Sequence, residues 1–337
     1  MTLEELVGQQ LAVGLPGPTL TDTARRMLRR THAGAVVVFA RNFEQAAQFT
    51  ALRRALEAAL GRPLLLMVDH EGGRIIRFAS DVTRFPSAEV QGRAGCEAIA
   101  RQGAVEAEEL RALGVSMNLA PCVDVRVAGG DPVIGDRSYG EDPAQVTACA
   151  LARIRGLQSH GVAACAKHFP GLGAVPSDPH HELPTIALDW RTLEEVHLPP
   201  FQAAVADGVA AVMSSHVCYP DLGEPPGLPA TFSPRLVTGL LRQRLGFDGV
   251  IMTDDLEMGA LRRLGGVGEA AVEAVAAGHD IALVCADPAA AEEAFSRLVA
   301  GYREGHLSEQ HLQTSVWRVA HLRKKYLVPP LSLTAGI

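Results

Sequence analysis

The chain has 337 residues, of which 47% are hydrophobic and 20% charged, and its formal net charge is −7. A chain of this length and composition can bury an ample core, which excludes a small domain that depends on disulfides or a structural metal. Acidic and basic residues are interspersed without long blocks of one sign, so we do not expect nucleic acid as a partner. No apolar run reaches the length of a membrane span, and the first residues lack the pattern of a signal peptide. We therefore expect no membrane partner and a cytoplasmic location.

Six cysteines are scattered along the chain, and no two of them have a C-x-x-C spacing. Cys165 and Cys285 fall inside apolar runs, where a thiol packs as a small hydrophobic group. This distribution predicts reduced thiols, and it argues against both a disulfide framework and a structural zinc site.

Short apolar runs alternate with longer segments of helical periodicity, which is the pattern of βα units around a parallel sheet. The strand candidates, each followed by turn or polar residues, are Leu11–Leu15, Ala35–Phe39, Leu64–Asp69, Val115–Leu119, Val162–Ala166, Ala210–Ser214, Val250–Thr253 and Ile281–Cys285. Eight such strands with helices between them predict an α/β fold, a closed (β/α)8 barrel that forms a single domain over residues 1–337.

Several helix starts can be located from their capping residues. Asn42 is a candidate cap for a helix over Phe43–Leu60. In Asp142-Pro143, Ser233-Pro234 and Asp287-Pro288, a capping side chain precedes a proline that suits the first helical position. After the eighth unit, apolar residues recur at helical spacing, at Leu312, Val316, Val319 and Leu322. We therefore expect a C-terminal helix that packs on the barrel.

Polar residues gather where five of the predicted strands end. A carboxylate buried at a strand end is costly unless it is paired or faces a polar ligand. The residues in question are Asp69, His70, Glu71 and Arg74 after the third strand, Asn118 and Asp124 after the fourth, Lys167 and His168 after the fifth, His216 after the sixth, and Asp254 and Asp255 after the seventh. Because barrel enzymes carry their active sites at the carboxyl ends of the strands, these residues predict a site at one rim.

Two groups in this set have the chemistry of catalysis. Asp254 ends an apolar strand and could act as nucleophile, general base or metal ligand, whereas Asp255 should point differently and cap or orient. In Asp178-Pro179-His180, a carboxylate precedes an imidazole by two residues and could accept its Nδ1 proton, which would make the pair a general acid and base. Gly171 and Gly173 would let the loop that carries this pair move over a substrate.

Five motifs occur in order between residues 68 and 258, namely Val68–Arg74, Asn118–Pro121, Asp131–Ser138, Lys167–Gly171 and Thr253–Met258. Together they resemble glycoside hydrolase family 3, and within it the single-domain bacterial β-N-acetylglucosaminidases of cell-wall recycling. The resemblance implies removal of terminal β-linked N-acetylglucosamine from muropeptides by a retaining double displacement. It implies Asp254 as the nucleophile and His180, backed by Asp178, as the acid and base.

The same resemblance implies that Asp69, Arg137, Lys167 and His168 bind the sugar in the −1 subsite. His216 is a further candidate, and Arg74 adds a positive donor that suits a polar ligand. It implies no cofactor and no metal, a small carbohydrate as the partner, and we expect a monomer. Two positions depart from the family pattern, since Leu172 stands where histidine is usual and Pro179 where serine is usual.

Three other activities remain open at this point. A metal-dependent barrel hydrolase could draw its ligands from His70, His168, His180, His216 and Asp254, although Lys167 beside them would repel a cation. Because a histidine acid and base carries no negative charge, phosphate could approach the glycosyl-enzyme, and the same fold could serve as a β-glucosaminide phosphorylase. A non-catalytic barrel would bind sugar without hydrolysing it.

Overall fold

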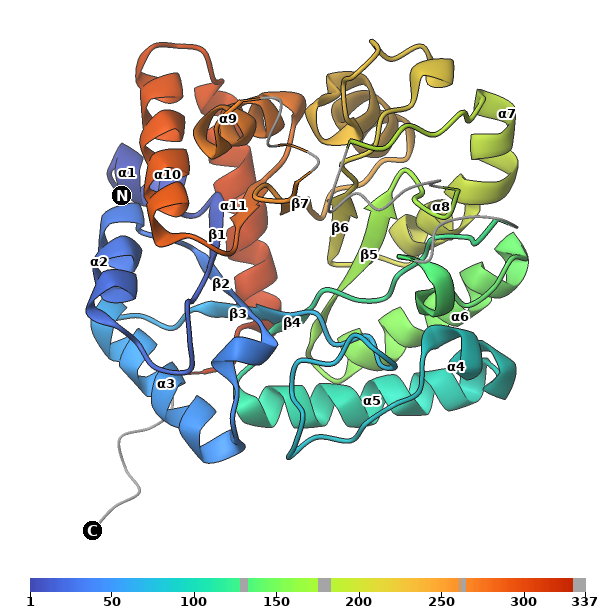
Figure 1. The fold of residues 1–337 in the computed structure, drawn as a ribbon, viewed down its shortest axis with the longest axis horizontal. Coiled ribbons are helices and arrows are strands. Elements are labelled where there is room, and N and C mark those ends of the chain that lie inside the picture. The colour runs from blue at the N-terminus through green and yellow to red at the C-terminus, as the bar shows by residue number, and fades with distance from the viewer. Residues whose placement is uncertain (128–132, 175–182, 260, 262–264, 330–337) are drawn as a thin grey trace.

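The structure is a computed structural model that describes residues 1–127, 133–174, 183–259, 261 and 265–329. Its centre is a closed parallel barrel whose strands neighbour one another in chain order, with β8 paired to β1 (Figure 1). The strands are β1 (Leu11–Gly14), β2 (Ala35–Val38), β3 (Leu65–Val68), β4 (Met117–Asn118), β5 (Ala163–Phe169), β6 (Ala211–Ser214), β7 (Val250–Asp255) and β8 (Ile281–Val284). Each predicted strand overlaps one of these, so the predicted (β/α)8 barrel is confirmed.

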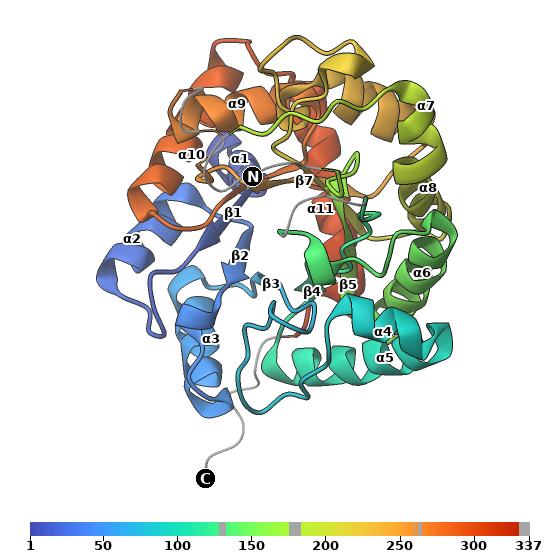
Figure 2. The same cartoon turned by 45° about the vertical axis from the view of Figure 1, so that its right-hand side comes forward.

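Helices surround the barrel on its outside, as the view in Figure 2 shows. The α-helices are α1 (Leu3–Gly8), α2 (Asp22–Thr31), α3 (Ala46–Leu60), α4 (Ala88–Ala94), α5 (Cys96–Leu113), α6 (Pro143–Ser159), α7 (Trp190–Thr192), α8 (Leu198–Ala206), α9 (Val267–Ala277), α10 (Pro288–Arg303) and α11 (Glu309–Tyr326). Two π-helical segments are η3 (Leu193–His197) and η6 (Arg235–Arg244), and the short 3₁₀ turns are η1 (Ala40–Asn42), η2 (Gly135–Arg137), η4 (Pro220–Leu222) and η5 (Ala230–Phe232).

Three of the four predicted helix caps are present. Asp142 accepts a hydrogen bond from the amide of Ala144, Asp287 from that of Ala289, and the Ser233 hydroxyl from that of Leu236. These bonds satisfy amides that have no partner within the first helical turn.

The prediction that Asn42 caps the third helix is wrong. The buried Asn42 side chain accepts from the amide of Phe39 and donates to the carbonyls of Leu15 and Gly17, so it joins η1 to the segment after β1. Because the chain still turns at this point, α3 begins only at Ala46.

Two apolar cores hold the barrel, one inside it and one between the strands and the helices. Neighbouring strand residues divide between them, as Ala12 belongs to the inner core whereas Leu11 and Val13 belong to the outer one, because side chains alternate along a strand. Val319, Leu322 and Tyr326 of α11 join the inner core. The predicted C-terminal helix therefore packs on the barrel, and it covers the amino ends of the strands.

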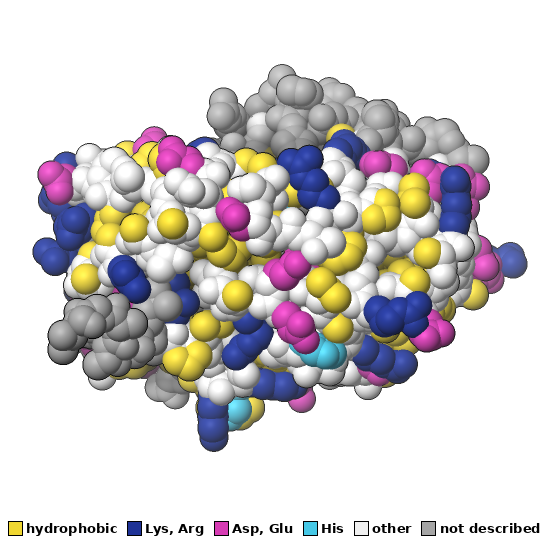
Figure 3. Space-filling model, turned by 90° about the horizontal axis from the view of Figure 1, so that it is seen from below, with side chains coloured by type: hydrophobic (Ala, Val, Ile, Leu, Met, Phe, Trp, Pro, Cys, Tyr) yellow, Lys and Arg dark blue, Asp and Glu magenta, His cyan; other side chains and the backbone are white. Residues whose placement is uncertain are grey.

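The surface and the cysteines agree with the composition. On the face seen from below, basic and acidic side chains are interspersed (Figure 3). The six cysteines are free, and all but Cys96 are buried. Among the described residues, no helix has the length and apolar character needed to cross a membrane.

Candidate active site

Three barrel strands carry charged side chains from the inner core to the carboxyl-end mouth. Their last apolar residues in the inner core are Met67, Cys165 and Met252. Side chains two residues apart lie on the same face of a strand. The next inward positions are therefore Asp69, Lys167 and Asp254, so the alternation that builds the inner core also places these groups in the mouth.

Asp69, Lys167, Glu71 and Arg137 form a continuous chain of ion pairs. The Lys167 Nζ atom lies 2.6 Å from Asp69 Oδ1 and 2.7 Å from Glu71 Oε1. Arg137 donates to both oxygens of Glu71, at 2.9 Å from Nε and 2.8 Å from Nη2. Three of the predicted sugar-binding residues are thus together, and Glu71, which the sequence placed at a strand end without a role, joins them.

Mutual pairing keeps this chain of side chains charged although most of it is buried. Burial of Glu71 opposes its ionisation, but the charges of Arg137 and Lys167 outweigh that effect and hold its pKa well below the usual range. Burial likewise opposes the charge of Lys167, and Asp69 and Glu71 raise its pKa above the usual value. The donors and acceptors are therefore fixed before any ligand enters.

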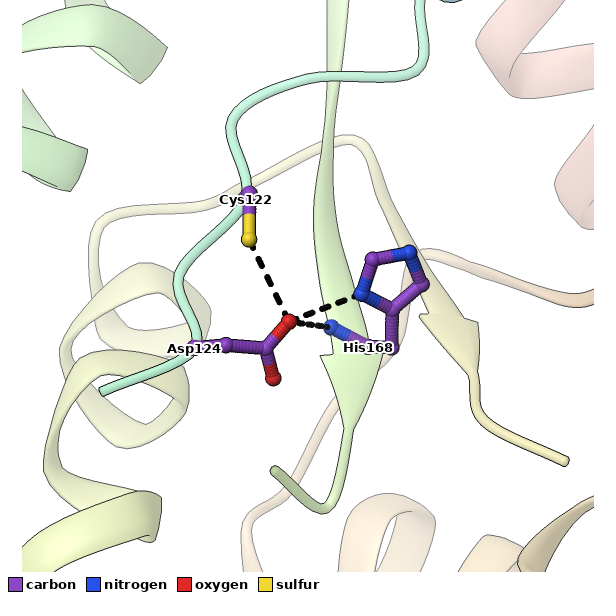
Figure 4. Close-up of side chains that lie close together, drawn as sticks. All are labelled: Cys122, Asp124 and His168. Carbon is purple, nitrogen blue, oxygen red and sulfur yellow. Dashed lines mark hydrogen bonds and ion pairs between the residues drawn. The ribbon is translucent and has the colours of Figure 1, made fainter. Parts of the chain in front are cut away.

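His168 is held by a second buried carboxylate, that of Asp124 (Figure 4). Asp124 Oδ2 lies 2.7 Å from His168 Nδ1 and accepts from the His168 amide at 3.1 Å and from the Cys122 thiol at 3.2 Å. Its other oxygen accepts from the Leu172 amide at 2.6 Å. Burial opposes ionisation of Asp124, but the charge of His168 and these hydrogen bonds lower its pKa.

This contact directs the two nitrogens of the His168 ring. Nδ1 faces the carboxylate, whereas Nε2 lies 3.5 Å from Arg137 Nη2 and belongs to the ion-paired side of the mouth. A histidine held in this way offers one defined nitrogen to a ligand. The sequence placed Asp124 at a strand end but did not assign it this partner.

Asp254 and Asp255 at the end of β7 have different surroundings. Asp254 is partly exposed, and its Oδ1 accepts from the Asp255 amide at 2.8 Å. Burial opposes its ionisation, but the charges of His168 and His216 and this hydrogen bond lower its pKa. Asp255 instead accepts from the amides of Glu257 and Cys285, at 3.1 and 3.2 Å, and burial raises its pKa to about 7. Asp255 therefore orients the chain after β7, whereas Asp254 keeps one oxygen free of hydrogen bonds from the described residues.

His216 and Arg74 lie outside the ion-paired cluster. Both ring nitrogens of the buried His216 have protein partners, Nδ1 the Thr231 hydroxyl at 2.7 Å and Nε2 the Asp255 carbonyl at 3.0 Å. Arg74 is exposed, pairs with Asp136 at 3.0 Å and donates to the carbonyl of Val133. His216 thus supports the end of β7, and Arg74 supports the segment that carries Arg137.

The predicted acid and base pair, Asp178 and His180, lies outside the described residues. The chain is described up to Ala174, and the two glycines expected to permit movement are tightly packed there. A Cβ atom at Gly171 would lie 2.7 Å from His197 Cβ, and one at Gly173 would lie 1.8 Å from the Val125 carbonyl oxygen. The requirement for glycine at these positions therefore comes from close packing at the base of the loop.

The histidines and Asp254 proposed as ligands for a metal-dependent hydrolase do not form a cluster spaced for a metal ion among the described residues. His70 Nδ1 accepts from the Arg77 amide, and burial lowers the pKa of His70 to about 4. In the part of the chain that the structure describes, the one group spaced for a metal ion is Cys122, Asp124 and His168. The 2.7 Å contact between Asp124 and His168 is a hydrogen bond, which already uses the atoms that would have to bind the ion.

Comparisons with known proteins agree with this geometry. Residues 2–322 match the model of the glycosyl hydrolase family 3 N terminal domain. The chain is 40% identical to a beta-hexosaminidase of Bordetella avium over 297 residues. This alignment covers 85% of this chain and 83% of that protein. A 39% identical beta-hexosaminidase of Bordetella parapertussis aligns over 94% of this chain and 88% of its own length.

Solved structures show the same relationship. A glycoside hydrolase family 3 beta-N-acetylglucosaminidase from Paenibacillus sp. str. FPU-7 superimposes with a TM-score of 0.95 at 39% identity, over 100% of this chain and 65% of that one. NagZ from Neisseria gonorrhoeae in complex with N-trifluoroacetyl-D-glucosamine superimposes with a TM-score of 0.78 at 32% identity, over 93% and 97% of the two chains. The chain therefore belongs to glycosyl hydrolase family 3, within its β-hexosaminidase branch.

Proposed function

We propose that the protein is a retaining β-N-acetylhexosaminidase that removes terminal non-reducing β-linked N-acetylglucosamine. The observation that carries the proposal is Asp254, a partly exposed carboxylate with a lowered pKa at the barrel mouth. The names of the related beta-hexosaminidases and the sugar analogue bound to the Neisseria gonorrhoeae protein support N-acetylglucosamine as the class of sugar.

In this mechanism Asp254 attacks the anomeric carbon as the bond to the leaving oxygen breaks, which gives a glycosyl ester of Asp254. His180, with Asp178 behind it, gives its proton to the leaving oxygen. In the second step His180 takes a proton from water, the water oxygen attacks the anomeric carbon, and Asp254 leaves as a carboxylate. The roles of His180 and Asp178 rest on the sequence motif alone.

The sugar hydroxyls have donors and acceptors of fixed charge beside the nucleophile. We assign Asp69, Lys167, Arg137 and His168 to the −1 subsite, with Glu71 and Asp124 as positioning residues behind them. Arg74 and His216 act through the segments that they support. The charges that pair these groups also keep them in place when the sugar is absent.

We further propose that residues 1–337 act as one catalytic unit, monomeric and cytoplasmic, with muropeptides as natural substrates. The free thiols suit a reducing compartment. The muropeptide assignment rests on the motif resemblance, and hydrolysis of purified muropeptides tests it.

The central test is hydrolysis of a chromogenic N-acetyl-β-glucosaminide, with the anomeric configuration of the first product followed by NMR. We expect retention, and loss of turnover by roughly 10²–10⁴-fold or more in Asp254→Ala and in His180→Ala. Asp22→Ala, an exposed aspartate on α2, is the control and should behave as wild type. Near-wild-type turnover of Asp254→Ala would show that the nucleophile is another group.

The same assay separates the other activities. Added phosphate should leave the rate unchanged and give no sugar 1-phosphate, whereas a phosphorylase would need phosphate and release that product. A chelator should likewise leave turnover unchanged, and a loss of activity that a divalent metal restores would favour the metal-dependent hydrolase.

A further inference from the structure

A cavity lies at the end of the barrel opposite the mouth. It has a volume of about 510 Å³ and is bounded by α1, the residues that follow α2 and α3, and α11. Gln9, His32 and Arg62 in its lining come just before β1, β2 and β3, so the cavity lies at the amino ends of the strands, away from Asp254. Its size falls within the range of small-ligand sites, roughly 300–1,000 Å³.

Two arginines reach one turn at the edge of this cavity. Arg62 Nη2 donates to the carbonyls of His32 and Ala33, at 3.0 and 2.8 Å, and Arg323 Nη2 donates to the carbonyl of Gly34. Arg62 Nη1 and Arg323 Nε are buried without a hydrogen-bond partner among the described residues. The carbonyls of the turn therefore accept hydrogen bonds from one nitrogen of each guanidinium, and a second nitrogen of each has no hydrogen-bond partner in the part of the chain that the structure describes.

The charge of the two guanidiniums is not balanced within the described part of the chain. Burial lowers the pKa of Arg62, and burial together with the charge of Arg62 lowers that of Arg323 to about 10. Glu5, which also lines the cavity, accepts from the Thr2 amide in the cap of α1. Other arginines that are buried or partly buried face a carboxylate, as in the pairs Arg53–Glu57, Arg153–Glu106 and Arg242–Asp280. Two neighbouring like charges without a counterion call for an anion from outside.

The opposite wall of the cavity is apolar and includes Leu60, Val316 and Val319. We propose that the cavity binds a small organic anion, whose carboxylate or phosphate pairs with Arg62 and Arg323 and whose apolar part lies against this wall. A guanidinium fork suits either oxyanion, because both offer two oxygens at matching spacing. The site is separate from the glycosidase mouth and does not rest on the proposed function.

Binding is measured by calorimetry and by the shift in melting temperature, with inorganic phosphate and hexanoate as the two probes. We expect wild type to bind at least one of them at a single site. The stronger probe identifies the oxyanion, and tighter binding of hexanoate would show that the apolar wall takes part. Arg62→Gln and Arg323→Gln should each weaken that binding by about 30-fold or more, since they remove one partner of a desolvated charge pair.

A third variant tests the charge balance without removing an arginine. Ala320 is an exposed residue of α11 that lines the cavity, three positions before Arg323. Ala320→Glu supplies a carboxylate of the protein's own, so it should abolish anion binding and raise the melting temperature of the unliganded protein. Lys324→Gln, which changes an exposed charge on the same helix outside the cavity, is the matched control and should bind as wild type.

The proposal is overturned if wild type binds neither probe, or if Ala320→Glu binds as tightly as wild type. Circular dichroism establishes that each variant is folded. Glycosidase turnover should be unchanged in Ala320→Glu, and failure of the glycosidase assay in all proteins would leave the binding result standing.

Discussion

Asp124 determines how His168 can be used in the barrel mouth. Its buried carboxylate accepts from the His168 and Leu172 amides and contacts His168 Nδ1. An asparagine has the same shape but only one acceptor oxygen, so its NH₂ group would face one of these donors. The negative charge that favours a proton on Nδ1 would also be lost.

For Asp124→Asn we expect kcat/KM on the chromogenic glycoside to fall about 10- to 100-fold, which corresponds to the loss of one charge-assisted hydrogen bond. Nitrogen NMR of the His168 ring should show a changed proton distribution between Nδ1 and Nε2. Asp142→Asn, a helix cap on α6, serves as control. An unchanged tautomer together with reduced stability would mean that Asp124 only holds the fold.

Sequence reasoning placed these residues at one rim because the end of an apolar strand can be recognised from local composition. Asp69, Lys167 and Asp254 stand where apolar runs give way to polar residues, and the carboxyl ends of barrel strands share one rim. Glu71 and Asp124 were placed at that rim as well, but their partners could not be predicted. Their roles depend on Arg137 and His168, whose positions are set by tertiary packing.

At the scale of elements, the segment after β5 is held more rigidly than its composition indicates. The Gly173 carbonyl accepts from the Val127 amide at 3.1 Å, and the glycine packs on the Val125 carbonyl. Gly171 has a φ of 139°, which L side chains rarely adopt. The start of the loop is thus fixed to the chain that follows β4.

Gly173→Ala should lower the free energy of unfolding by roughly 1–3 kcal/mol, because its Cβ cannot fit beside the Val125 carbonyl without a backbone shift. Turnover should fall as well, since this segment leads to His180. Urea unfolding measures the first effect. Gly17→Ala is the control, because a Cβ at Gly17 meets no atom within 4 Å. Equal stability of the two variants would contradict the packing role.

Element ends show the same limit of local rules. Asn42 has the residue type and spacing of a cap, yet its side chain bonds to the carbonyls of Leu15 and Gly17. Residue type and spacing describe only the neighbours of Asn42 in the sequence, whereas its hydrogen-bond partners lie about 25 positions away. β5 runs to Phe169, beyond the predicted Ala166, because Lys167 and Phe169 still pair with β6 although Lys167 is charged.

At the scale of the whole molecule, the barrel itself was predictable because it depends on repetition. Eight apolar runs separated by helical segments leave few alternatives, and an error of a few residues at one strand does not alter the count. The packing of α11 on the barrel could be predicted from its apolar spacing. The cavity between α11 and α1 could not, because it depends on where the ends of α2 and α3 lie in the folded structure.

Asp255 should make the stability of the whole molecule depend on pH, and its pKa fixes the sign of its contribution. Asp255, with a pKa of about 7 in the folded state, binds a proton there that the unfolded chain releases near its ordinary value of 3.8. The contribution of Asp255 to the unfolding free energy should therefore fall as pH rises from about 4 to 7, by at most about 1.4 kcal/mol per pH unit. The buried His70 and His279, whose pKa values burial lowers to about 4, act in the opposite direction over this range. Glu71 and Asp124 have lowered pKa values, so their contribution is present above about pH 4 and is lost as pH falls further.

Asp255→Asn keeps an oxygen acceptor for the Glu257 and Cys285 amides and removes the titration. Urea unfolding at pH 4.5, 6 and 7.5 should show that wild type loses stability relative to this variant as pH rises. Asp22→Asn should differ from wild type by the same amount at all three pH values. A constant difference between Asp255→Asn and wild type would mean that Asp255 does not titrate in this range.

The ion-paired chain in the mouth also has a consequence for the solvent. Lys167 and Arg137 carry two positive charges, and Asp69 and Glu71 carry two negative charges, so the four side chains sum to zero. This chain of side chains has no net charge of its own to attract mobile salt ions, so an uncharged sugar that binds to it displaces water without releasing ions. The selectivity of the mouth then comes from the directions of its hydrogen bonds, and salt in the surrounding solution should change it little.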